Sequence, residues 1–326
     1  MVENCIQVGA GHMPKIGLGL WKLPEPSVAS TVVDAIAAGY RHLDSAADYG
    51  NETAVGDGLR EALKTSEVTR DDLWVTSKLW NTFHRPEHVR AACERSLKDL
   101  GLECLDLYLI HFPIALKYVD FSERYPPEWI YDPKAAAPRM EPDWVPIAET
   151  WGAMEGLVEA GLVKEIGVCN FNTGLLHDLI ASAHIKPALL QVESHPYLTQ
   201  ERLIRLAHQY DMAVTAFSPL GSLSYLELGM AEAQESLLDE PSICAAAERL
   251  QRSPAQVLLR WGLQRGTAVI PKSSQLERLR ENIDVFNFSL SDAEMTAISA
   301  LNRGRRFNDP GLFCEEAFNG FYPIYD

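Results

Sequence analysis

Short runs of apolar residues alternate along this chain with longer segments in which apolar residues recur at helical spacing. Apolar runs without polar alternation are typical of strands buried on both faces, as in a parallel sheet. From residue 16 onward eight such runs occur, beginning near residues 16, 41, 73, 106, 165, 189, 213 and 268. Amphipathic segments typical of helices separate them. This repeat predicts an α/β protein, a (β/α)8 TIM barrel in which residues 1–326 form a single domain.

Three kinds of segment depart from this repeat. Residues 5–16 predict a small N-terminal β-hairpin that turns at residues 9–11. Residues 113–145 and 218–240 predict long loops at the C-terminal face of the barrel, and residues 302–326 predict an irregular tail. The first long loop is rich in proline and aromatic residues, which favours an ordered loop that serves a site. Its aromatic residues, from Tyr118 to Trp144, suit either a pocket wall or an oligomer surface.

A doubly wound open sheet is the alternative architecture. Such sheets often carry a Gly-x-Gly-x-x-Gly turn between a strand and a helix, where it binds a dinucleotide. The nearest match here, Gly9-Ala10-Gly11, lies in the predicted hairpin and is followed by His12-Met13-Pro14. The barrel is therefore the preferred prediction.

Composition excludes several classes of partner. A net charge of −16 argues against nucleic acids and anionic membranes, and no apolar run reaches the ~18 residues of a membrane span. Residues 1–4 lack the basic and apolar pattern of an export signal. The 6 cysteines are scattered without a Cys-x-x-Cys motif, which is typical of reduced thiols in a cytoplasmic protein. The histidines show no ligand spacing, so we expect no metal site.

Candidate chemistry gathers at three predicted strand ends. Asp44, Lys78 and His111 each end an apolar run, and Tyr49 follows the first of them by one short loop. A phenol is a poor acid at neutral pH, with a pKa of about 10. A nearby ammonium lowers that value. We therefore expect a phenol that can give a proton to a carbonyl oxygen while a hydride reaches its carbon. Taken alone, each residue has a structural alternative. Lys78 could be a solvated strand-end lysine with Asp44 as a chance partner, His111 could be a core histidine with its hydrogen bonds satisfied, and Tyr49 could belong to an ordinary turn.

At this point the chain resembles the aldo-keto reductase superfamily, from about residue 7 to about residue 310. The segments that carry the resemblance are residues 39–46, 49–52, 77–80, 107–111, 167–171 and 270–273. Within the superfamily the chain is most similar to xylose reductases, on residues 111–115, 125–127 and 306–310.

The resemblance implies a nicotinamide cofactor lying across the strand ends. It implies that Tyr49 is the general acid and that Lys78 lowers the Tyr49 pKa. It also implies that Asp44 pairs with Lys78 and that His111 orients the substrate carbonyl. Asn170 and Gln191, beside Cys169, would bind the cofactor carboxamide, and Phe217 would stack on the nicotinamide. The other implied cofactor residues are Ser218, Leu220 and Ser222 at the pyrophosphate, and Lys272, Ser273, Ser274, Arg278 and Asn282 at the adenosine end. The implied substrate residues are Trp21, Trp80, His111 and Asn308.

Three positions depart from the pattern of the superfamily. Cys169 replaces a serine beside the carboxamide, and a thiol is a weaker hydrogen-bonding partner. Ser274 stands where related xylose reductases have asparagine. After Pro310 the tail lacks the expected Trp-Asp pair. Because the tail forms one pocket wall in the family, this last change bears on the substrate more than on the chemistry.

Several of these residues have a structural alternative. Trp21, Trp80 and Phe217 could pack in the barrel core. Lys272 and Arg278 form either a solvated helix face or a clamp on the 2′-phosphate of NADPH, and a guanidinium matches a phosphate well. The resemblance to dual-specificity reductases implies that Glu227 binds the ribose hydroxyls of NADH; a solvated loop carboxylate is the alternative.

The sequence thus predicts an NADPH-preferring reductase of open-chain aldoses and other aldehydes, with NADH as a second cofactor and xylose to xylitol as the leading reaction. A broad-specificity aldehyde or ketone reductase is the alternative within enzymes. A nucleotide-sensing barrel without catalysis is the alternative outside them. The expected partner is a small-molecule aldose or aldehyde, and the protein is expected to be a monomer or homodimer.

Overall fold

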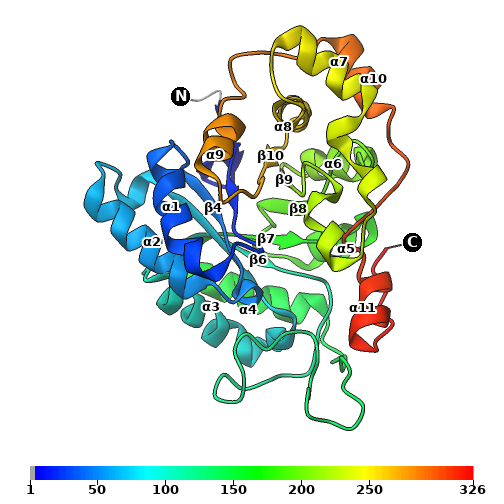
Figure 1. Cartoon of the computed structure of the whole chain (residues 1–326). Coiled ribbons are helices and arrows are strands. Elements are labelled where there is room, and N and C mark those ends of the chain that lie inside the picture. Colours follow the sequence, from blue (N-terminus) through cyan, green and yellow to red (C-terminus); the bar gives the residue numbers. More distant parts are fainter. Residues whose placement is uncertain (1–3, 326) are drawn as a thin grey trace.

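The computed structural model describes residues 4–325, and its centre is a curled sheet of eight parallel strands surrounded by helices (Figure 1). The strands follow one another around the sheet in sequence order. They are β3 (Leu18–Gly19), β4 (His42–Asp44), β5 (Trp74–Leu79), β6 (Leu105–Ile110), β7 (Val163–Cys169), β8 (Leu189–Glu193), β9 (Ala213–Phe217) and β10 (Ala268–Val269). Every strand except β7 and β9 is buried along its whole length, as the apolar runs predict.

Backbone hydrogen bonds join the first and last strands and close the sheet. The N–H of Val269 donates to the carbonyl of Lys15 (2.8 Å), and the N–H of Gly17 donates to the carbonyl of Val269 (2.9 Å). Close approach at this seam requires Gly19, because a Cβ there would lie 2.8 Å from the carbonyl oxygen of Ile270. The predicted barrel is confirmed, and the open doubly wound sheet is excluded.

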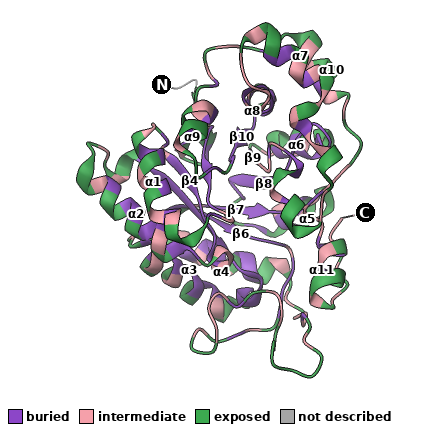
Figure 2. Ribbon diagram, viewed as in Figure 1, coloured by how far each residue is buried: buried purple, intermediate pink, exposed green. Residues whose placement is uncertain are grey.

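The helices lie outside the sheet, with their buried faces turned toward the strands (Figure 2). They are α1 (Val28–Ala37), α2 (Glu52–Thr65), α3 (Pro86–Leu100), α4 (Ile147–Glu159), α5 (Thr173–Ser182), α6 (Glu201–Gln209), α7 (Pro241–Leu250), α8 (Pro254–Gln264), α9 (Leu276–Ile283), α10 (Asp292–Ser299) and α11 (Pro310–Phe318). Helices α7 and α10 pack together at one edge of the molecule, beyond the ring (Figure 1). None of the helices within residues 4–325 has the length and apolar character needed to cross a bilayer.

The predicted N-terminal hairpin is confirmed as β1 (Cys5–Val8) paired with β2 (Gly11–Pro14). Val8 and Met13 of the hairpin are fully buried and pack in one cluster with the first residues of several strands, among them Trp74, Ala213 and Ala268. The hairpin therefore covers the N-terminal end of the barrel, and the opposite end remains for a site. Met1–Glu3, on which the expectation of no export signal mostly depends, lie outside the described residues.

The prediction of a wholly irregular tail is wrong, because residues 310–318 form α11. The side chain of Asp309 accepts a hydrogen bond from the N–H of Gly311 (2.8 Å), and Pro310 occupies the first helical position. Both are ordinary helix-start signals. The long loop of residues 113–145 contains no helix or strand, as predicted, and only an isolated bridge joins Leu116 to Pro142.

A buried carboxyl group ties three elements together beside the barrel. Glu52 of α2 is 3% exposed and accepts hydrogen bonds from the hydroxyls of Ser77 on β5 (2.6 Å) and Ser96 on α3 (2.8 Å). Burial raises the pKa of Glu52 to about 7, although the two hydroxyls act to lower it. The folded state therefore favours the protonated carboxyl group.

This shift makes the contribution of Glu52 to stability depend on pH. Below the ordinary pKa of about 4.5 both states are protonated, and above about 7 the folded state bears the full cost of ionisation. We expect Glu52→Gln to gain roughly 2 kcal/mol of unfolding free energy over the native protein on going from pH 5 to pH 8. Urea unfolding at both pH values measures this gain. Glu61→Gln, at an exposed carboxylate of α2, is the control and should show no gain; equal behaviour of the two variants would contradict the assignment.

Candidate active site

The C-terminal ends of the strands open into a cavity of about 870 Å³. This volume is in the range of small-molecule and cofactor sites. The cavity extends from Trp21 and His111 at one end to Arg278 and Asn282 at the other, and residues of the 218–240 loop and of the tail also line it. Of the sequence-predicted site residues, most therefore share one cavity.

A buried ammonium group organises the residues behind the cavity wall. Lys78 of β5 is 0% exposed, and its Nζ donates to Asp44 Oδ1 (2.5 Å), to the carbonyl oxygen of Ser45 (2.7 Å) and to the Tyr49 hydroxyl (3.1 Å). Asp44 ends β4, and Tyr49 lies in the 3-10 turn that follows. The three acceptors satisfy all three protons of the ammonium. The predicted juxtaposition of Tyr49, Lys78 and Asp44 is therefore present.

The charge of Lys78 is held by its neighbours. Burial alone would lower the pKa of Lys78, but Asp44 and Tyr49 act in the opposite direction and raise it above its ordinary value. The carboxylate of Asp44 receives a second donor, because Gln191 Nε2 donates to Asp44 Oδ2 (2.7 Å). Both oxygens of the carboxylate are thus occupied, which a buried ion pair needs in order to offset desolvation.

The net shift of the Tyr49 pKa is opposite in direction to the sequence prediction. Lys78 does act to lower the Tyr49 pKa, but burial outweighs it, and the pKa of Tyr49 lies above its ordinary value. The expectation of a phenol made more acidic overall is therefore wrong for this state of the protein. The phenol is protonated at neutral pH, which is the form that a proton donor requires.

His111 faces the same cavity as a neutral ring. Burial, and then the charge of Lys78, hold the pKa of His111 well below its ordinary value. The ring lies edge-on to Tyr49, with 5.8 Å between ring centroids. Its Nδ1 atom is buried with no hydrogen-bond partner among residues 4–325. A neutral imidazole beside a protonated phenol can hydrogen-bond a substrate oxygen without competing for the proton.

Three side chains continue this network along the cavity wall. The thiol of Cys169 points to Gln191 Oε1 at 3.8 Å, a long contact, as expected of a weak donor. Asn170 Nδ2 donates to the carbonyl of His111 (2.9 Å) and contacts Cys169 Sγ at 3.2 Å. The hydroxyl of Tyr325, near the end of the tail, donates to Asn170 Oδ1 (3.2 Å). Tyr325 was not identified from sequence.

The opposite end of the cavity has the donors that a phosphate needs. Lys272, Ser273, Arg278 and Asn282 all line it, and within residues 4–325 neither Lys272 nor Arg278 forms an ion pair. Two cations at one end of a cavity, in a protein of net charge −16, indicate an anion site, although the charge of Lys272 also acts on Glu227. Between the two ends, Phe217, Ser218 and Leu220 also line the cavity. The residues present therefore fit an extended, phosphate-bearing ligand such as a nicotinamide dinucleotide.

Four of the residues singled out from sequence do not line the cavity. Lys78 lies behind Tyr49, and Trp80 is fully buried against His111, with its indole N–H on the carbonyl of Glu128 (3.1 Å). The hydroxyl of Ser222 donates to the carbonyl of Glu235 (3.1 Å), and Ser274 is exposed. The packing alternative therefore describes Trp80, whereas Trp21 and Phe217 face the cavity.

An ion pair joins two sides of the cavity. Lys22, just after β3, pairs with Glu227 of the 218–240 loop, and Lys22 Nζ also donates to the carbonyl of Ser224 (3.0 Å). The pKa of Glu227 is lowered, chiefly by the hydrogen bond from Lys22. Glu227 is therefore paired with Lys22 in this structure, a partner that no sequence pattern indicated.

Asp48, Phe313 and Phe318 are among the cavity-lining residues that were not singled out from sequence, and Trp129 of the aromatic 113–145 loop also lines the cavity. Burial raises the pKa of Asp48 to about 7, with a further rise from Glu128. Its position directly before Tyr49 was the available signal. Trp129 stacks on Phe318, with centroids 5.7 Å apart, so this part of the 113–145 loop forms pocket wall. Trp144, in contrast, is 82% exposed.

Comparison with known proteins agrees with the geometry. The profile of the aldo/keto reductase family matches residues 15–303. The chain is 49% identical to a probable NAD(P)H-dependent D-xylose reductase of Aspergillus clavatus, over 95% of this chain and 94% of that protein. It is 49% identical to the NAD(P)H-dependent D-xylose reductase of Pyricularia oryzae, over 92% and 93%. The structure of the aldose reductase from Schistosoma japonicum matches with a TM-score of 0.85 and 39% identity, over 98% and 99%.

The barrel fold, the buried ammonium–phenol pair and these relatives thus identify an oxidoreductase with a (β/α)8 barrel. The chain belongs to the aldo/keto reductase family. Among residues 4–325 no group of three or more His, Cys, Asp or Glu side chains is arranged to hold a metal ion.

Proposed function

We propose that this protein reduces the aldehyde group of open-chain aldoses, with D-xylose to xylitol as the leading reaction, and that it uses NADPH in preference to NADH. The observation that carries the proposal is the protonated Tyr49 held 3.1 Å from the fully buried Lys78 at the wall of a cavity that also exposes His111. The names of relatives 49% identical over almost the whole chain support the same substrate and cofactor.

In this proposal the reduced nicotinamide, when bound, supplies a hydride to the carbonyl carbon. Tyr49 gives its phenolic proton to the carbonyl oxygen, so that the aldehyde becomes a primary alcohol. Lys78 stabilises the phenolate that remains, because its ammonium already contacts the hydroxyl. Asp44 holds Lys78 in place, and the neutral His111 hydrogen-bonds the substrate oxygen and orients it.

The cavity walls divide the cofactor between two recognition regions. Asn170 and Gln191, with Cys169, would hydrogen-bond the carboxamide, and Phe217 would stack on the ring. Ser218 and Leu220 would contact the pyrophosphate; Ser222 belongs to the same loop and supports it through its bond to Glu235. Lys272, Ser273, Arg278 and Asn282 would bind the adenosine end and its 2′-phosphate, with Ser274 beside them. Glu227 would lie near the ribose.

The substrate end combines polar and apolar walls. His111 and Asn308 would meet sugar hydroxyls, and Trp21 covers the apolar side, with Trp80 behind His111. Trp129, Phe313 and Phe318 also line the cavity, and these aromatic side chains favour the second candidate, a broad-specificity aldehyde reductase. The intact ammonium–phenol pair argues against a nucleotide-sensing barrel. We further propose one cytoplasmic barrel domain that acts as a monomer or homodimer.

Removal of the Tyr49 hydroxyl tests the chemistry. We expect Tyr49→Phe to lower kcat for xylose reduction by about 10²-fold or more, because the proton donor is lost. Lys78→Met should be nearly as damaging. Initial rates of NADPH oxidation measure both. Tyr118→Phe, at a tyrosine outside the cavity wall, is the control and should keep its rate; a Tyr49→Phe enzyme with most of its rate would exclude the mechanism.

A comparison of two aldehydes tests the substrate. We expect kcat/KM for xylose, referred to its small open-chain fraction, to exceed kcat/KM for butanal, because Asn308 and His111 offer hydrogen bonds that an alkanal cannot use. A high apparent KM for total xylose should accompany this preference. The opposite ranking would favour the broad-specificity reductase.

A single cation tests the cofactor preference. Arg278→Ala should raise the KM for NADPH about tenfold or more, since a charge-assisted contact to the 2′-phosphate is lost, and should leave the KM for NADH within about twofold. Arg280→Ala, on the same helix but outside the cavity, is the matched control. Equal losses for the two cofactors would overturn the clamp.

A further inference from the structure

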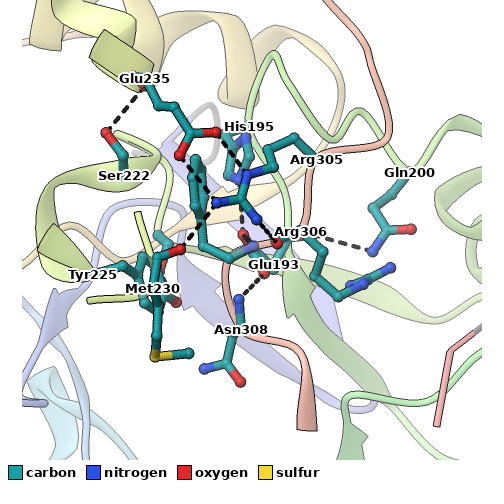
Figure 3. Close-up of polar contacts among 12 residues, drawn as sticks. Glu193, His195, Gln200, Ser222, Tyr225, Met230, Glu235, Arg305, Arg306 and Asn308 are labelled. Atoms are coloured by element: carbon teal, nitrogen blue, oxygen red, sulfur yellow. Dashed lines mark hydrogen bonds and ion pairs between the residues drawn. The ribbon is translucent and has the colours of Figure 1, made fainter. Parts of the chain in front are cut away.

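A buried carboxylate that takes no part in the proposed chemistry lies beside the substrate end of the cavity. Glu193 is the last residue of β8, and both Glu193 and His195 are 0% exposed. His195 Nε2 lies 2.8 Å from Glu193 Oε1 and must be the donor, because a carboxylate only accepts (Figure 3). Both side chains of this pair are closed to solvent.

The carboxylate also holds the chain just before α11. The N–H of Phe307 donates to Glu193 Oε1 (2.9 Å), and the N–H of Asn308 donates to Glu193 Oε2 (2.9 Å). Burial would raise the pKa of Glu193, but His195 and the two backbone N–H groups outweigh burial and lower it. An ionised group that accepts three hydrogen bonds therefore joins the barrel to the tail.

The side chain of Phe307 fixes the same segment from the other side. Its ring lies 5.6 Å from the ring of Tyr225 in a stacked arrangement and 5.2 Å from that of His195. Arg305, just before it, makes a bidentate ion pair with Glu235 of the 218–240 loop (2.7 and 3.0 Å; Figure 3). The backbone at residues 307–308 thus has little freedom.

Asn308 is the residue that this arrangement directs. Its side chain points away from Glu193 in Figure 3, and it lines the cavity. Its Oδ1 atom is buried with no hydrogen-bond partner among residues 4–325. An unpaired buried amide oxygen is costly unless a ligand supplies a donor, and an aldose hydroxyl is such a donor.

We propose that Glu193 is a positioning residue for substrate selectivity. By holding the N–H groups of Phe307 and Asn308, it fixes the direction of the Asn308 amide, so that the site favours hydroxylated aldehydes over apolar ones. This inference rests on the proposed aldose reductase function and adds to it a residue that does not touch the substrate. Glutamine cannot replace it, because its single carbonyl oxygen cannot serve all three donors and its NH₂ group faces one of them.

A double-mutant cycle with two substrates tests the proposal. We expect Glu193→Gln to raise the KM for xylose about tenfold and to change kcat for xylose, and kcat/KM for butanal, by less than about threefold. Asn308→Ala should have the same signature. Because Glu193 acts through Asn308, adding Glu193→Gln to Asn308→Ala should cause little further loss with xylose. Losses that multiply, or an equal loss with both aldehydes, would overturn the proposal.

Glu155 provides a matched control for a purely structural role. Its carboxylate on α4 is also buried and accepts two consecutive backbone N–H groups, those of His184 (2.8 Å) and Ile185 (2.9 Å), but it does not line the cavity. Glu155→Gln should therefore leave the ratio of kcat/KM for xylose to that for butanal unchanged. A shift in this ratio as large as that of Glu193→Gln would count against a specific role for Glu193.

Two further outcomes are separable. If Glu193→Gln does not fold, Glu193→Asp takes its place, because the shorter carboxylate keeps its charge but moves away from residues 307–308. The same loss of selectivity for xylose is expected, and an equal loss with both aldehydes would overturn the proposal.

If the native protein reduces butanal but not xylose, the proposed function itself fails, and the inference falls with it. Xylose reduction that is insensitive to Glu193 overturns the inference alone.

Discussion

The buried contact between Lys78 and Asp44 is the constraint on which the rest of the site depends. Both side chains are almost completely removed from water, and an unpaired charge there would cost several kcal/mol, about 3–5 when one partner is lost. The two residues lie on neighbouring strands in fixed register, so the sheet holds them at 2.5 Å. Gln191 and Ser45 complete their hydrogen bonds. Because all of these hydrogen bonds are made, the buried ammonium of Lys78 can remain charged beside the Tyr49 hydroxyl.

Local pattern was sufficient for most of the fold. A run such as Leu105–Ile110, buried at every position, has no alternation and so indicates a parallel strand, and the eight-fold repeat of strand and helix then indicates a closed barrel. Helix α11 was missed for a physical reason. Its nine residues have no clear polar stripe, and Phe313 and Phe318 pack against Trp129, a residue of a distant loop. The start signals Asp309 and Pro310 are present in the sequence, but a helix stabilised by tertiary contacts has only a weak periodic pattern of its own.

The candidate site also contains some features that could be predicted from sequence and others that could not. Asp44, Lys78 and His111 could be placed from sequence because strand ends meet at one face of a barrel. The direction of the net pKa shift of Tyr49 could not be predicted, since that pKa depends on how much of the whole structure covers the hydroxyl. Contacts between residues far apart in the chain were equally invisible. The pairing of Glu193 with the backbone of Asn308, and of Tyr325 with Asn170, depends on how the tail returns to the barrel.

The site contains a second lysine–carboxylate contact of opposite character. Lys22 is 21% exposed and Glu227 is 71% exposed, so mobile ions reach this pair and screen it, whereas they do not reach Lys78 and Asp44. Exposed pairs contribute only about 0–1 kcal/mol. Breaking the Lys22–Glu227 contact therefore needs little energy, and less as salt is added. Ionic strength therefore acts on this outer contact between the chain just after β3 and the 218–240 loop, while the ammonium beside the proton-donating phenol remains insulated from it.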